Sequence, residues 1–168
     1  MLSAVRAYVR WVEAVNRVVG IFAMYLVFVM MAVLVYSSVT KALFSQPHWY
    51  LEVAQFLMVA YFLLGGGYSM QTDSHVRMDL FYCRWSPRTK AWVDVVTVFF
   101  LVFYLIFLLW GGYLSTEYSI AYNETTRSLW NPPLWPIKVI MMAGIVLMLL
   151  QTIATFFRDV ASLRGIAL

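Results

Sequence analysis

The sequence predicts an all-α integral membrane protein whose four transmembrane helices form a single membrane domain over residues 1–168. Of these 168 residues, 63% are apolar and only 12% are charged, and the mean hydropathy is +0.78. Water-soluble domains are about 45–50% apolar and about 25% charged, and so short a chain cannot bury this apolar excess in a core of its own. Lipid must therefore be the solvent for much of the protein.

Four charge-free windows are long enough to cross a bilayer, which takes about 20 apolar residues in a helix. They cover residues 18–40, 53–72, 95–116 and 139–157, and none contains Asp, Glu, Lys, Arg or His. An ionisable residue at membrane depth usually marks an ion path or a proton relay. We therefore expect no such path within this chain.

The distribution of Lys and Arg predicts the orientation of the spans. Nine of these residues lie in the N-terminal segment, the loop between spans two and three, and the C-terminal tail, whereas three lie in the other two loops. Because positive residues concentrate on the cytoplasmic side, we expect both termini in the cytoplasm. The net charge of +4 is ordinary for a membrane protein and gives no reason to expect a nucleic-acid partner.

Helical structure is expected to extend beyond two of the spans. Residues 3–17 predict an amphipathic helix that lies on the cytoplasmic interface and runs into span one, with one charged and one apolar face (Arg6, Arg10, Glu13 and Arg17; Val5, Val9, Val12 and Val15). A cleaved signal peptide is disfavoured, because its apolar core would be about 7–15 residues long and followed by an A-x-A-like site. Ser86 and Pro87 predict a helix start ahead of span three, as N-cap and first helical residue.

The sequence contains no constellation of residues suited to catalysis or to binding a cofactor. His48 and His75 lie in loops on opposite sides, so they do not predict a haem held within the spans. The single cysteine, Cys83, excludes an internal disulfide and a multi-cysteine metal site. No Gly-rich phosphate loop, HExxH motif or nucleophile elbow occurs. We therefore expect no enzymatic activity, no metal site and no cofactor.

The two outer loops combine aromatic residues with prolines. The first contains Pro47, His48, Trp49 and Tyr50, and the other contains Trp130, Pro132, Pro133, Trp135 and Pro136. Three prolines in five residues exclude regular helix and predict a stiff turn back into span four. Trp and Tyr at a span boundary are interfacial anchors in the first instance; a docking surface is the alternative interpretation.

Small residues within the spans predict close helix contacts. Gly65 with Ser69, and Gly111 with Ser115, are small-xxx-small pairs that let neighbouring helices approach. The run Gly65-Gly66-Gly67 also leaves a hinge near the cytoplasmic end of span two as an alternative.

A family resemblance rests on several short motifs in a fixed order. These are Glu52 at the start of span two, the glycine-rich Leu64–Tyr68, the run His75-Val76-Arg77-Met78-Asp79-Leu80, then Pro133-Leu134-Trp135 and Leu149-Leu150-Gln151. Together they resemble the small membrane subunit of a TRAP (tripartite ATP-independent periplasmic) transporter over roughly residues 20–160. Met78 departs from the family pattern, in which a branched aliphatic residue is usual.

The resemblance implies a role in a bacterial inner-membrane transporter. Family members pair with a large multi-span subunit, here expected as a separate chain, which carries the substrate and sodium sites. A soluble periplasmic protein delivers the substrate, usually an organic acid. The small subunit would brace the large one and add to the docking surface. The candidate residues for the subunit interface are Glu52, Gly65, Gly66, Gly67, His75, Arg77, Asp79, Gly111 and Ser115, and those for docking are His48, Trp49, Trp130, Pro133 and Trp135.

Two other functions stay open at this stage. A membrane-anchor subunit of a respiratory enzyme would bind haem or quinone, and a self-sufficient small transporter would move its substrate without partners. Within the main interpretation, Arg77 and Asp79 are expected to anchor the cytoplasmic end of span two, with Asp79 pairing with Arg84 or Arg88. The identity of the transported substrate depends on the partners.

Overall fold

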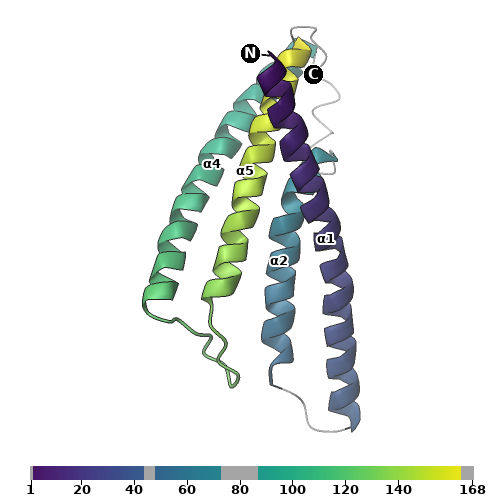
Figure 1. Cartoon of the computed structure of the whole chain (residues 1–168), viewed down its shortest axis with the longest axis vertical. Coiled ribbons are helices and arrows are strands. Elements are labelled where there is room, and N and C mark those ends of the chain that lie inside the picture. Colours follow the sequence, from purple (N-terminus) through teal and green to yellow (C-terminus); the bar gives the residue numbers. More distant parts are fainter. Residues whose placement is uncertain (1, 44–47, 73–86, 164–168) are drawn as a thin grey trace.

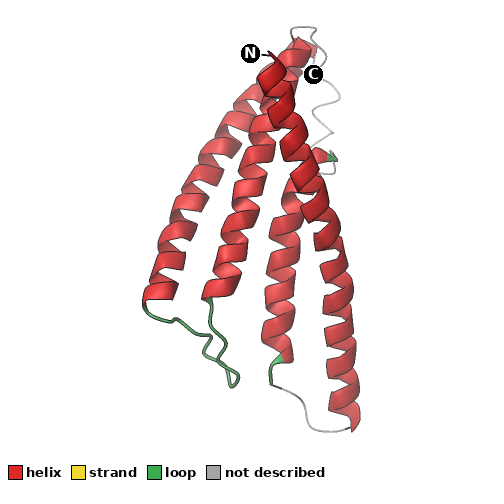
Figure 2. Ribbon diagram, in the orientation of Figure 1, coloured by secondary structure: helices red, strands yellow, loops and turns green. Residues whose placement is uncertain are grey.

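A computed structural model describes residues 2–43, 48–72 and 87–163, and within these residues it contains helices and no strand (Figure 2). The helices are α1 (Leu2–Leu43), α2 (Tyr50–Gln71), α4 (Pro87–Ala121) and α5 (Trp135–Leu163). Each contains a stretch long and apolar enough to cross a membrane. The predicted all-α fold with four spans is therefore confirmed.

Helix α1 is longer than the predicted boundaries imply. It runs without a break over 42 residues, so the expected interfacial helix at 3–17 and span one are parts of one helix. At 1.5 Å per residue it is about 63 Å long, roughly twice the hydrocarbon thickness of a bilayer. At the other predicted extension, α4 begins at Pro87, as its Ser-Pro signal indicated. Contact between residues 3–17 and a membrane surface stays a prediction.

The helices form a row in the order α4, α5, α2, α1 (Figure 1). Neighbours in the row pack together, and the N-terminal part of α1 also crosses α5. Along the helix axes, the row has two ends. The start of α1 and the end of α5 lie at one of them, and the loop between α4 and α5 lies at the other (Figure 1). In the most apolar stretch of each helix, 28% of the residues are buried in α5 but only 11% in each of the others. Helix α5 is thus the most enclosed element.

Most large apolar side chains point away from the row. Along α4, for example, Phe99, Phe103, Phe107 and Trp110 are all exposed. Lipid tails are as apolar as these side chains, so no hydrophobic force drives them together inside a membrane. The exposed faces are therefore suited to lipid or to another membrane subunit.

The N-terminal part of α1 packs against the C-terminal half of α5. Val9 and Val12 form a buried cluster with Ala154. The hydroxyl of Tyr8 donates a hydrogen bond to the carbonyl oxygen of Leu150, at 3.3 Å. The valine face expected from the sequence therefore contributes to packing within the chain.

One turn further along, α1, α2 and α5 meet at a buried polar contact. Asn16 Nδ2 donates a hydrogen bond of 2.9 Å to Gln151 Oε1, and both side chains are 1% exposed. Gly67 of α2 lies against the Asn16 amide, and a Cβ at position 67 would overlap Asn16 Oδ1. The absence of a side chain at Gly67 is what makes room for the amide.

Other glycines bring the helices together at nearby levels. Gly144 of α5 lies against the backbone of Leu63 in α2, and a Cβ there would stand 2.8 Å from the Leu63 carbonyl oxygen. By contrast, a Cβ at Gly65 or Gly111 would meet nothing within 4 Å. The prediction that these two glycines mark close contacts is therefore wrong within this chain, because they face away from the neighbouring helices. Gly66 and Gly67 make the contacts instead.

We expect Gly67→Ala to destabilise the protein by about 1–3 kcal/mol, because an added methyl group in a packed site forces its neighbours to move. Gly65→Ala is the matched control, since its methyl group meets open space and alanine is the better helix former. Thermal unfolding of the purified protein in detergent, followed by circular dichroism, measures both effects.

The clash also predicts non-additivity with Asn16→Ala, which removes the group that the new methyl would strike. In the Asn16→Ala background, Gly67→Ala should therefore destabilise the protein only slightly further. Equal costs in the presence and absence of the Asn16 side chain would contradict the packing described for this junction.

Candidate functional site

The loop between α4 and α5 forms a closed turn over residues 122–134. Its two arms join at a β-bridge between Thr125 and Pro133. Next to the bridge, the backbone N–H of Thr126 donates to the carbonyl oxygen of Pro132, at 3.0 Å. On the other side of the bridge, the backbone N–H of Leu134 donates to the carbonyl oxygen of Glu124, at 2.9 Å. Asn123 and Asn131 have φ values of 47° and 52°, in the left-handed region that Asn tolerates better than most residues.

The tip of this loop exposes two large apolar side chains. Leu129 is 86% exposed and Trp130 is 47% exposed. Behind them, Ser128 Oγ accepts a hydrogen bond from the backbone N–H of Asn131, at 3.1 Å. The tip thus holds apolar side chains outward on a hydrogen-bonded backbone.

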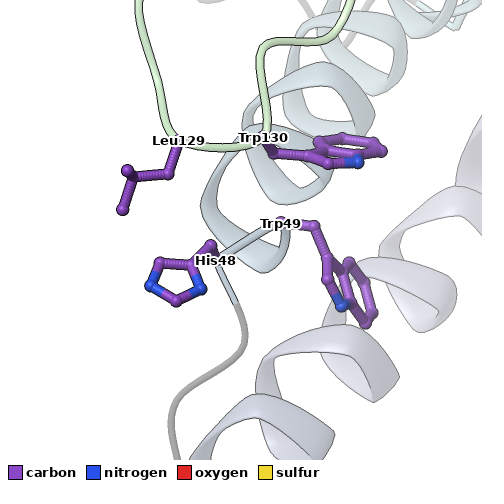
Figure 3. A pocket seen from close by; sticks show the side chains of 4 residues that line it. All are labelled: His48, Trp49, Leu129 and Trp130. Carbon is purple, nitrogen blue, oxygen red and sulfur yellow. The ribbon is translucent and has the colours of Figure 1, made fainter.

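The tip faces the residues that precede α2, across an open groove (Figure 3). The groove has a volume of about 510 Å³ and is lined by His48, Trp49, Leu129 and Trp130. The Trp49 ring stacks on Tyr36 of α1, with centroids 6.1 Å apart and an interplanar angle of 28°. The groove therefore joins loops that belong to two different helix pairs.

The groove brings together three of the five docking candidates, His48, Trp49 and Trp130. The other two, Pro133 and Trp135, do not line it; both are exposed, Pro133 on the second arm of the loop and Trp135 at the start of α5. Leu129 was missed, because a single apolar residue in a polar loop matches no motif. Its position next to Trp130 in a proline-bounded turn was the available signal.

A charged cluster at the base of the loop was also missed. Lys138 Nζ donates to Glu124 Oε2 at 2.8 Å and to the backbone carbonyl oxygen of Ser115 at 3.2 Å. Ser119 Oγ donates to the same carboxylate oxygen at 2.7 Å, and Ser119 is fully buried. The hydrogen bonds from Lys138 and Ser119 lower the pKa of Glu124 below its ordinary value of 4.5. From the sequence, Lys138 counted only toward the orientation of the spans.

Glu52 lies in the first turn of α2 and is buried, at 8% exposure. Among the described residues, its buried Oε2 atom has no hydrogen-bond partner. A buried acceptor without a donor is costly. Glu52 therefore differs from Glu124, whose carboxylate is held by two donors.

The other interface candidates divide into three groups. Gly66 and Gly67 take part in packing within the chain, whereas Gly65 and Gly111 face open space. Ser115 is half-buried and contributes its carbonyl oxygen to Lys138. His75, Arg77 and Asp79 lie outside the described residues, as does the expected pairing of Asp79 with Arg84 or Arg88. Within the described part of the chain, no cluster of three or more His, Cys, Asp or Glu side chains could hold a metal ion.

Comparison with known protein families identifies one match. The family described as "Tripartite ATP-independent periplasmic transporters, DctQ component" matches residues 30–162. The match covers well over half of the chain, from the middle of α1 to the last turn of α5. No curated protein sequence matches the chain.

The lowered pKa of Glu124 predicts a pH-dependent contribution to stability. Its carboxylate stabilises the fold fully above the ordinary value of 4.5, and the contribution is lost as the pH falls through the lower pKa of the folded state. The thermal midpoint of the wild type should therefore exceed that of Glu124→Gln near neutral pH, and the difference should shrink below that value. Glu117→Gln, which removes an exposed carboxylate from the same end of α4, controls for the change in net charge. A difference that stays constant with pH would contradict the ion pair.

Proposed function

Because the chain belongs to the DctQ component family of tripartite ATP-independent periplasmic transporters, we propose that it braces a large transport subunit and helps to dock a substrate-binding protein. The family assignment and the four apolar helices make it a multi-pass inner-membrane component of such a transporter. The family match over residues 30–162 is the observation that carries the proposal. In the proposed complex, the large subunit is a separate chain that moves an organic acid with sodium, and the small subunit is non-catalytic.

The shape of the chain supports a bracing role. A row one helix thick leaves apolar side chains exposed along its length, so it can offer one face to the large subunit and another to lipid. Gly65 and Gly111 have open space around them, which would let helices of the large subunit approach closely. None of the four windows contains Asp, Glu, Lys, Arg or His, which supports assigning the substrate and sodium sites to the large subunit.

The groove is the proposed contribution to docking. Leu129 and Trp130 are exposed on the α4–α5 loop (Figure 3), which lies at the end of the row away from the start of α1 (Figure 1). The positive-inside rule assigns that end to the periplasm. Exposed apolar groups clustered with an aromatic partner are typical of protein interaction sites. Insertion of the same side chains into lipid headgroups is the competing interpretation.

Trp130→Ala should weaken capture of the cognate binding protein by roughly tenfold or more, the usual effect of removing an interfacial tryptophan. The measurement is binding of the soluble protein to the complex in nanodiscs. The control is Tyr122→Ala: Tyr122 is 72% exposed on the same loop and contacts the Tyr118 ring, with centroids 4.5 Å apart, but does not line the groove. If both variants captured the binding protein as well as the wild type, lipid anchoring would be favoured over docking.

Asp79→Ala should reduce recovery of the large subunit in a tagged pull-down without altering substrate choice, because Asp79 is proposed to anchor the cytoplasmic end of α2. Glu117→Ala, at an exposed carboxylate on the opposite end, is the matched control. A wild-type yield from Asp79→Ala would exclude this anchoring role.

In liposomes, uptake should require the large subunit and the binding protein; uptake by this chain alone would contradict the bracing function itself.

A further inference from the structure

Lys138 connects three elements at the end of the row that carries the groove. It lies in the first turn of α5, and its ammonium group donates to the backbone of α4 at Ser115 and to the loop carboxylate of Glu124. The side chains of Lys138 and Glu124 are 19% and 38% exposed. Charge-assisted hydrogen bonds of this kind are stronger than neutral ones, and partial burial limits screening by salt. One ammonium group therefore ties α4, the loop and α5 together.

Glu124 is fixed by its main chain as well as by its carboxylate. Its backbone N–H donates to the carbonyl oxygen of Ser119, at 3.0 Å. Its own carbonyl oxygen accepts from the backbone N–H of Leu134, at 2.9 Å. Leu134 is the last residue before α5 begins, so Glu124 closes the base of the loop.

The position of the tip depends on this base. Beyond the pairing of Thr126 with Pro132, only residues 127–131 remain as the tip, and they include Leu129 and Trp130. Among the described residues, no hydrogen bond or ion pair connects the tip to His48 or Trp49. The distance across the groove is therefore set from the α4–α5 side by the base of the loop.

We propose that Lys138 and Glu124 are positioning residues: they form a latch that holds Leu129 and Trp130 opposite His48 and Trp49, and so presents the groove to the periplasmic binding protein. The inference rests on the proposed docking function. The latch itself makes no contact with the groove, because neither Lys138 nor Glu124 lines it.

Lys138→Met, in the complex with the large subunit, removes the ammonium group and keeps an unbranched side chain. Amide hydrogen exchange at Thr126 and Leu134 should accelerate by roughly tenfold, as expected for the loss of a charged hydrogen bond, and capture of the binding protein should weaken by a similar factor. Lys41→Met removes an exposed cation from the last turn of α1 and should change neither. Glu124→Gln is the second variant if Lys138→Met impairs assembly.

A disulfide across the loop distinguishes positioning from direct contact. Thr125→Cys and Pro133→Cys, in a Cys83→Ser background, place two thiols at the β-bridge, where opposite residues are close enough to be cross-linked. Oxidation should restore capture to the Lys138→Met protein, and reduction should weaken it again. Failure of the oxidised form to restore capture would overturn the positioning role.

The two proposals fail in different ways. Unchanged exchange at Thr126 and Leu134 in both Lys138→Met and Glu124→Gln would overturn the latch, whatever the docking result. Faster exchange with wild-type capture in Lys138→Met, together with wild-type capture in Trp130→Ala, would overturn docking at the groove and with it the functional part of the latch.

Discussion

The hydrogen bond from Asn16 to Gln151 joins the first and last helices at the point where both pack around Gly67 of α2. These two amides are 135 positions apart in sequence, and both are withdrawn from solvent. In a membrane, apolar contact gives little net drive for helix association, so close packing at small residues and buried hydrogen bonds must supply it. The junction supplies both. It also lies where α1 crosses from α2 onto α5, so the order of helices in the row depends on it.

The packing of the helices also affects the groove, which lies at the opposite end of the row. The groove has one wall from the loop before α2 and the other from the loop before α5. Its width therefore depends on how α2 and α5 are held together along their length. Glycine contacts between these two helices, at Gly66 and Gly144, keep that spacing small. The proposed docking surface is made of two loops and needs such a rigid support, because each loop alone presents only half of the lining.

Much of the fold was predictable because lipid imposes a simple requirement on sequence, namely long windows without charge. The start of α4 at Pro87 was also predictable, since a Ser-Pro pair has a local physical meaning. The rotation of each helix about its own axis was not predictable. Gly65, Gly66 and Gly67 are consecutive, and only packing decides that Gly66 and Gly67 face a neighbouring helix while Gly65 does not. The Asn16–Gln151 pair could not be predicted either, because no local pattern links polar residues so far apart. At the candidate site, aromatic and proline content identified most of the groove, whereas the roles of Lys138 and Glu124 depend on how three elements meet.

The continuity of α1 has a mechanical consequence. Its N-terminal part is held to α5 through Tyr8 and Leu150, and its C-terminal part carries Tyr36, on which Trp49 of the groove stacks. An unbroken helix about 63 Å long acts as a lever, so a tilt of about 5° displaces one end relative to the other by about 5 Å. Because Trp49 stacks on Tyr36, such a tilt would move one wall of the groove relative to the α4–α5 loop. The contact between the N-terminal part of α1 and α5 therefore bears on the width of a groove that lies at the other end of the same helix.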